Sequence, residues 1–139
     1  MSRAFMTFWI ILIIIVLAAG YVRLAPTDPA KWHKALTFEK DRRLPGGTQK
    51  VIAAGADTLA KLDAIITAHP RTKVIAGSVE EGHITYEART KVMQFPDYIT
   101  VQQADDQVKI YSRLRFGRRD MGVNHDRLSA WLNTLQAGG

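Results

Sequence analysis

The fold is decided by residues 107–136, QVKIYSRLRFGRRDMGVNHDRLSAWLNTLQ, because the hydrophobic periodicity changes once within this stretch. From 107 to 116 every second residue is apolar or small, which is the period of a strand with one buried face. From 125 to 136 the apolar residues Leu128, Trp131, Leu132 and Leu135 recur at helical spacing. Asn124, between the two periods, is suited to cap the helix. We expect this helix to pack on the apolar face of the strand.

Three earlier stretches have the same two-residue period and predict an antiparallel meander: Thr72–Val79, His83–Val92 and Tyr98–Gln103. A helix is expected from residue 58 to His69, where Pro70 ends it, and a short strand over 49–54. The predicted fold class is α+β. It consists of an antiparallel β-sheet of four to five strands with two helices covering one face.

An uncharged apolar run, FMTFWIILIIIVLAAGYV, occupies residues 5–22 between Arg3 and Arg23. A helix needs about 20 residues to cross a hydrocarbon core of about 30 Å. We therefore expect an N-terminal transmembrane anchor over residues 1–22 that contacts membrane lipid. A cleaved signal peptide is the alternative, because residues 17–20 are small like those of a processing site.

Residues 23–47, rich in proline and basic clusters, are expected to form a membrane-proximal connector. Its lysines and arginines either face anionic lipid headgroups or belong to a solvated, weakly ordered linker. The excess of positive charge after the apolar run favours a cytoplasmic location for the rest of the chain. The similarity of the start to a signal sequence favours export instead.

The chain is short and basic, with 139 residues, a net charge of +6 and no cysteine. Its length excludes a multidomain enzyme, and the lack of cysteine excludes disulfides and thiolate chemistry. The positive charge favours an anionic surface or partner. Aromatic residues are too few among the basic ones to predict nucleic-acid binding.

Basic residues alternate along the predicted face opposite the apolar one. Because arginine recognises phosphate and carboxylate groups in a bidentate manner, this face is a candidate site for an anionic ligand or partner. The alternative is a solvated sheet face with Glu87 and Asp120 as local partners. The candidate residues are Arg89, Lys91, Arg113, Arg115, Arg118 and Arg119.

Catalytic patterns are missing from the sequence. The four histidines have no metal-ligand spacing, and no glycine-rich segment has the spacing of a phosphate-binding loop. Ser112 is not in a nucleophile elbow. We therefore expect no catalytic residue, no metal and no cofactor.

Residues 112–127, SRLRFGRRDMGVNHDR, follow the pattern S-x-x-R-x-G-x-x-D-x-G-x-N-x-x-R. This pattern resembles the signature of the domain of unknown function 1499 family, in particular its membrane-anchored, alphaproteobacterial-like members. The resemblance extends over about residues 48–136, and we place the domain at 48–139. The family's N-terminal Cys-Pro-x-x-Pro-Asn-Cys segment is absent here, and its Arg-Ser pair is Arg89-Thr90. The motif residues are Ser112, Arg115, Gly117, Asp120, Gly122, Asn124 and Arg127.

The resemblance implies a location in the bacterial envelope or the chloroplast lumen, and no established activity. With the apolar run, it predicts a single-pass inner-membrane protein with a periplasmic domain. The first functional hypothesis is a non-catalytic, membrane-anchored accessory or interaction module, such as a small subunit of a larger membrane protein complex. A periplasmic binder of a small anionic or lipid-like ligand is the alternative. A hydrolase centred on Ser112, Arg115 and Asp120 ranks third.

A filled core would favour the module, and a continuous apolar cavity between sheet and helix would favour the binder. The spacing of Arg115, Asp120, Asn124 and Arg127 also predicts a hydrogen-bonded junction that stabilises the fold. In that junction Asp120 compensates Arg127 in the first helical turn.

Overall fold

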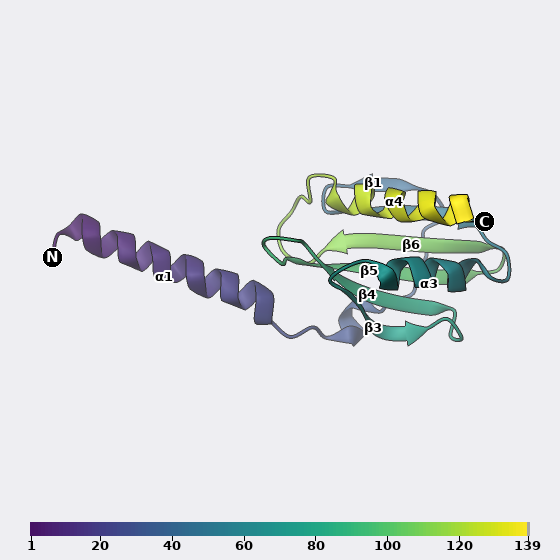
Figure 1. Cartoon of the computed structure of the whole chain (residues 1–139), viewed down its shortest axis with the longest axis horizontal. Helices are drawn as coiled ribbons and strands as arrows, with labels where there is room; N and C mark the ends of the chain where they lie inside the picture. The colour runs from purple at the N-terminus through teal and green to yellow at the C-terminus, as the bar shows by residue number, and fades with distance from the viewer. Residues whose placement is uncertain (139) are drawn as a thin grey trace.

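An apolar helix projects from one end of a layered domain (Figure 1). The computed structural model describes residues 1–138, and its first helix, α1, spans Arg3–Leu24. No residue of α1 is buried. By length and composition α1 fits a membrane span or a signal sequence. It is followed by the four-residue helix α2, Pro29–Trp32.

The sheet has six strands in the order β1-β2-β6-β5-β4-β3, and all neighbours are antiparallel. The last four strands in the chain form the predicted meander. β2 adds to the free edge of β6. The bounds are β1 Arg42–Leu44, β2 Gly47–Ala53, β3 Thr72–Ser78, β4 His83–Arg89, β5 Pro96–Ala104 and β6 Gln107–Leu114.

Six strands exceed the four to five expected because the end of the connector also pairs. Pro45 and Gly46 turn the chain, so that Leu44 lies opposite Gly47 and Arg42 opposite Gln49. A side chain at Gly47 would collide with the Ser112 carbonyl oxygen on β6, so glycine is required where β2 approaches β6. A three-residue strand has no periodicity that a sequence reveals.

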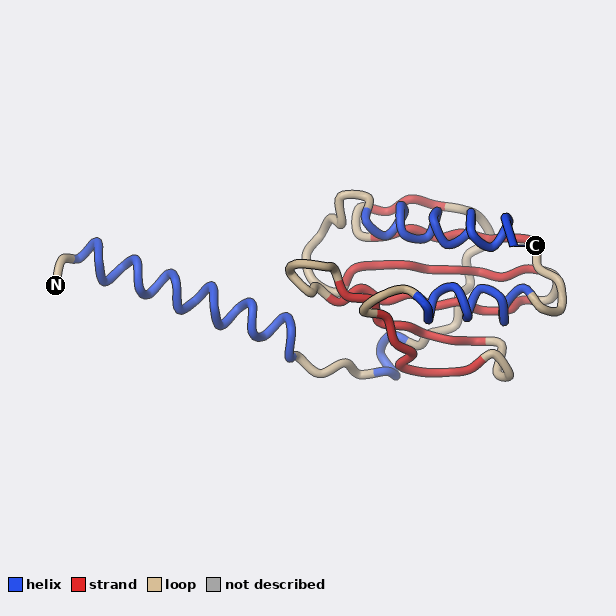
Figure 2. Tube along the Cα trace, in the orientation of Figure 1, coloured by secondary structure: helices blue, strands red, loops and turns tan. Residues whose placement is uncertain are grey.

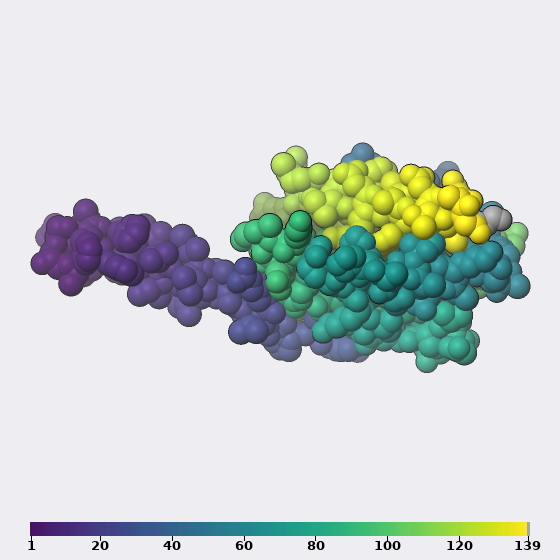
Figure 3. All heavy atoms as spheres, in the orientation of Figure 1, coloured from purple at the N-terminus to yellow at the C-terminus, as the bar shows by residue number. Residues whose placement is uncertain are grey.

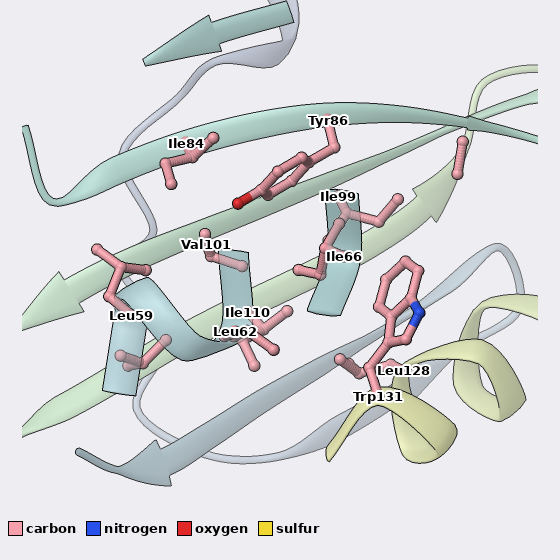
Figure 4. Close-up of a cluster of buried hydrophobic side chains, with 12 residues drawn as sticks. Leu59, Leu62, Ile66, Ile84, Tyr86, Ile99, Val101, Ile110, Leu128 and Trp131 are labelled. Carbon is pink, nitrogen blue, oxygen red and sulfur yellow. The ribbon is translucent and has the colours of Figure 1, made fainter. Parts of the chain in front are cut away.

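Two helices, α3 (Thr58–Ala68) and α4 (Val123–Gly138), cover one face of the sheet (Figures 1 and 2). Trp131 and Leu128 of α4 and Leu62 of α3 point at the strands (Figure 4). Leu132 packs at the edge of this core, whereas Leu114 and Leu135, expected inside it, are only half-buried. The core residues are Leu59, Leu62, Ile66, Ile84, Tyr86, Ala88, Ile99, Val101, Val108, Ile110, Leu128 and Trp131.

The opposite, polar face is covered by part of the connector. We call residues 26–39 the strap; they pass behind the sheet in Figure 2 and contact β4, β5 and β6. The Leu36 N–H donates to Gln102 Oε1 at 2.6 Å, and Lys109 pairs with Glu39 at 2.9 Å. The basic face is therefore not the open, solvated surface that the alternation suggests.

Trp131→Ala should lower the free energy of unfolding by about 3–5 kcal/mol, because it leaves a cavity between α4 and the sheet. Chemical denaturation of the full chain in mild detergent, followed by far-UV circular dichroism, measures this change. Asn133→Ala, on the exposed side of the same helix, should change stability by less than about 0.5 kcal/mol. Equal effects of the two substitutions would mean that Trp131 does not anchor α4.

Candidate functional site

Three of the motif residues, Ser112, Asp120 and Asn124, converge where β6 passes into α4. Ser112 Oγ donates to Asn124 Oδ1 at 2.5 Å, and both side chains are fully buried. Asn124 Nδ2 donates in turn to Asp120 Oδ2 at 2.9 Å. Three side chains thus form one continuous chain of hydrogen bonds that ties the last strand to the last helix.

Asp120 also satisfies the free N–H groups at the start of α4. Its carboxylate accepts from the Gly122 N–H at 2.9 Å and the Asn124 N–H at 3.2 Å. Met121 and Gly122 have φ of +56° and +81°, and this left-handed turn brings the carboxylate back to those N–H groups. The expectation that Asn124 caps the helix is therefore wrong, because Asp120 has that role.

Arg127 pairs with Asp97 on β5 at 3.2 Å, and not with Asp120 as expected. Both side chains are less than a tenth exposed. Burial raises the pKa of Asp97 to about 6, although Arg127 opposes part of that rise. This pair holds α4 against the core face of the sheet.

Arg115 lies on the other face of the sheet, away from Asp120. Its guanidinium donates to the Pro26 carbonyl at 2.9 Å and to Tyr98 Oη at 3.1 Å. The predicted junction of four residues is therefore divided, since Asp120 and Asn124 act together while Arg115 and Arg127 have other partners. The sheet alternation places Ser112 and Arg115 on opposite faces, which explains the division.

This geometry does not suit nucleophilic catalysis at Ser112. Its hydroxyl is inaccessible and donates to Asn124, whose amide oxygen is not a base. Within residues 1–138, no group of three or more His, Asp and Glu side chains is arranged to hold a metal ion.

Arg113 joins the strap to the polar face. It donates to the Trp32 carbonyl at 2.7 Å and to Thr100 Oγ1 at 2.9 Å, and its guanidinium carbon lies 4.7 Å from the centre of the Tyr111 ring. No carboxylate of the described residues lies within 4.0 Å of the guanidinium. Desolvation lowers the pKa of Arg113 to about 10. This cation is thus largely buried without an anionic partner.

The start of the strap is held by a second polar network. Thr27 Oγ1 donates to Glu87 Oε2 at 3.0 Å and shares a 2.6 Å hydrogen bond with Tyr98 Oη. The Trp32 ring stacks on Tyr98 with 4.2 Å between ring centres. Glu87 is also paired with Arg89 at 2.9 Å.

A stacked pair of histidines holds the middle of the strap. The rings of His33 and His83 are 3.8 Å apart, and His33 Nδ1 lies 2.8 Å from Thr85 Oγ1. Burial, with the charge of His83, lowers the pKa of His33. The neutral form of the His33 ring is therefore favoured at this contact.

A groove of about 520 Å³ lies between the strap, the β1–β2 turn and β6. Its basic lining residues are Lys31, Lys34, Arg113 and Arg118. Its aromatic lining residues are Trp32, Phe38 and Tyr111, and no acidic residue lines it. Such a groove is suited to a small anion that carries an apolar group.

The six basic residues expected to bind a ligand or partner do not form one site. Arg113 and Arg118 line the groove, whereas Arg89 and Arg115 belong to the network around Glu87 and Tyr98. Lys91 and Arg119 are exposed on two loops. The sequence pattern does not predict the groove residues of the strap, Lys31, Trp32 and Lys34. Their clustering is visible in the sequence, where it predicts either contact with anionic lipid headgroups or a solvated, weakly ordered linker.

The family model described as Protein of unknown function (DUF1499) matches residues 22–135. The chain belongs to this family. The match begins in the last turn of α1 and includes the whole strap, which precedes the resemblance expected from about residue 48. The DUF1499 region of the chain therefore contains the motif junction, the strap and the groove. No curated protein matches this sequence.

Asn124→Ala should lower the free energy of unfolding by about 1–3 kcal/mol, because it leaves Ser112 Oγ buried without a partner. Asp120→Asn should lower it by about 1 kcal/mol through weaker capping of α4. Chemical denaturation measures both changes. Asp126→Asn, an exposed acid in the same helical turn, is the matched control and should have a smaller effect. Unchanged stability in both motif variants would contradict the structural role of the junction.

Asp97→Asn should remove part of the pH dependence of stability. The pKa of Asp97 is raised from 3.8 to about 6 in the folded state, so the native protein binds this proton more tightly than the unfolded chain. As the pH rises from about 4 to about 6, the free energy of unfolding of the wild type should therefore fall by about 3 kcal/mol relative to that of the variant. Denaturation of both proteins across this range measures the difference, and parallel curves would contradict it.

Proposed function

We propose that this DUF1499 protein is a non-catalytic, membrane-anchored accessory or interaction module of the cell envelope, such as a small subunit of a larger membrane protein complex. The observation that carries the proposal is the hydrogen-bonded junction of Ser112, Asn124 and Asp120. Three polar side chains of the motif by which the family is recognised are bonded to one another, and two of them, Ser112 and Asn124, are fully buried. Such an arrangement stabilises a fold and offers no reacting group to a substrate.

The filled core supports the interaction module over a protein that carries a ligand between its sheet and its helices. Leu62, Ile66 and Leu128 are fully buried between the sheet and the helices, and Trp131 is 4% exposed. Side chains therefore occupy the layer in which such a carrier would hold an apolar ligand.

The relation of α1 to the domain supports anchoring. Tyr21 contacts Phe116 at 5.9 Å between ring centres, Ala25 is buried, and Arg115 holds the carbonyl of Pro26. The helix thus leaves the domain from a defined position. The proposed location is the inner membrane with the domain in the periplasm, which rests on the signal-like start and the family resemblance.

A second candidate function is the binding of a small anionic or lipid-like ligand in the groove. The specific observation is the Arg113 guanidinium, which lacks a carboxylate partner among the described residues and lies beside three other cations of the lining. An anion in the groove would compensate this charge.

Native mass spectrometry of the full chain, purified in mild detergent with a C-terminal tag, distinguishes the two functions. The module predicts a stoichiometric protein partner, and tagging that partner should recover this chain in equal amount. The ligand binder predicts a chain without a protein partner and with a small bound mass. That mass should be lost in Lys31→Gln/Arg118→Gln and kept in the control Lys40→Gln/Lys61→Gln, whose residues lie outside the groove.

The proposed location is tested on the same chain with alkaline phosphatase at its C-terminus. A periplasmic domain predicts an active enzyme in intact cells. An inactive phosphatase, with fluorescence from a cytoplasmic reporter at the same position, would contradict that side of the membrane.

A further inference from the structure

Exposed apolar side chains gather on two loops. Among residues 25–138, six large apolar side chains are exposed, and all but Val74 lie on these loops. Met121 is 90% exposed and Val92 is 76% exposed. We call residues 90–95 and 115–123 the end loops; their exposed apolar residues are Val92, Met93, Phe95, Met121 and Val123.

The end loops are neighbours at the end of the domain from which α1 projects. The Arg115 N–H donates to the Pro96 carbonyl at 3.3 Å, which joins the roots of the two loops. Phe116, in the second loop, contacts Tyr21 in the last turns of α1. In Figure 3 the green surface of the first loop lies beside the end of α1, and the lime surface of the second is at the same end of the domain.

Both loops have hydrogen bonds that hold their apolar side chains outward. Thr90 and Phe95 are joined by two hydrogen bonds, the Thr90 N–H to the Phe95 carbonyl at 3.0 Å and the Phe95 N–H to Thr90 Oγ1 at 2.9 Å. Arg89 donates to the Gln94 carbonyl at 2.9 Å. In the other loop, Asp120 accepts from the backbone around Met121. The exposure of these residues is therefore built into the loop structure.

The charge of the end loops is positive. Lys91, Arg118 and Arg119 are exposed there. The only acid, Asp120, is occupied by N–H groups of the chain. Apolar side chains mixed with cations are typical of surfaces that rest on an anionic bilayer, where each basic residue adds about 1 kcal/mol of attraction.

We propose that the end loops dock on the surface of a bilayer rich in anionic lipid. Met121 and Val92 enter the headgroup region, while Arg118 and Arg119 contact lipid phosphates. This inference rests on the proposed anchoring by α1, which brings the same end of the domain to the membrane. Docking would fix the orientation of the domain relative to the bilayer and keep its groove and strap at a constant distance from the bilayer surface.

Because the chain has no cysteine, single cysteines permit a direct test. Met121→Cys, Val92→Cys, Glu81→Cys and Ile13→Cys are each labelled with a fluorescent dye in the full chain. The proteins are reconstituted into vesicles of phosphatidylcholine and phosphatidylglycerol that contain brominated lipid, a quencher. Glu81 lies in the β3–β4 turn, at the opposite end of the sheet, and serves as the exposed control.

Docking predicts strong quenching at positions 121 and 92 and little at 81. Equal, weak quenching at 121, 92 and 81, with strong quenching at 13, would overturn the docking and leave the anchor intact. Weak quenching at 13 would instead remove the anchor and the proposed function with it. Quenching at 121 and 92 that appears only without a copurifying protein would assign the end loops to that protein.

The charge contribution is tested with two matched double variants. Arg118→Gln/Arg119→Gln should reduce quenching at position 121 at least twofold in anionic vesicles. For the protein without these two substitutions, replacing anionic vesicles by vesicles of phosphatidylcholine alone should reduce quenching at position 121 by the same factor. Lys34→Gln/Lys61→Gln removes equal charge away from the end loops and should leave quenching unchanged. Each pair also removes one cation from the groove, so a difference between them reports on the end loops. Equal effects would overturn the assignment of Arg118 and Arg119 to lipid.

Discussion

Two guanidinium groups, one on β6 and one directly after it, hold the backbone of the strap on the sheet, and much of the remaining architecture depends on this contact. Arg113 binds the carbonyl of Trp32, and Arg115 binds that of Pro26. Charged donors make stronger hydrogen bonds than neutral ones, particularly where water is partly excluded. The two bonds determine where the strap crosses the strands. They thereby also determine where α1 leaves the domain and where the groove opens.

Because the strap covers the polar face, both faces of the sheet are largely buried, but the side chains buried on the two faces differ in their chemistry. On one side, α3 and α4 bury an aliphatic and aromatic layer that stabilises the fold. On the other side, Thr85, Glu87 and Thr100 are buried among hydrogen bonds to the strap. Buried polar groups need partners, and the strap provides them. The unbalanced charge of Arg113 is the exception, and it lies at the groove.

The buried residues of the family motif and the surfaces suited to binding are therefore different parts of the molecule, although the motif residues from Arg115 to Gly122 lie in the second end loop. Ser112, Asp120 and Asn124 connect strand to helix, and their polar atoms are used within the protein. The groove and the end loops present cations and apolar groups at the surface of the domain. The motif determines the shape of the second end loop, because Asp120 organises the turn that exposes Met121. A motif residue with a structural role can thus be needed for binding because it positions the neighbouring residue that makes the contact.

The sequence by itself determined the elements whose signal is local: the apolar α1, the alternating strands of the meander, and the stripe of α4 with Trp131 and Leu128. It also identified the family, because the motif lies within sixteen consecutive residues. Only the tertiary structure decided that Arg115 binds Pro26, that Arg127 binds Asp97, and that a connector covers the polar face. Arg113 and Trp32 are 81 residues apart, and Arg115 and Pro26 are 89. Periodicity reports which face of a strand is apolar, but the partner of a charged side chain depends on strand order and register, which bring distant segments together.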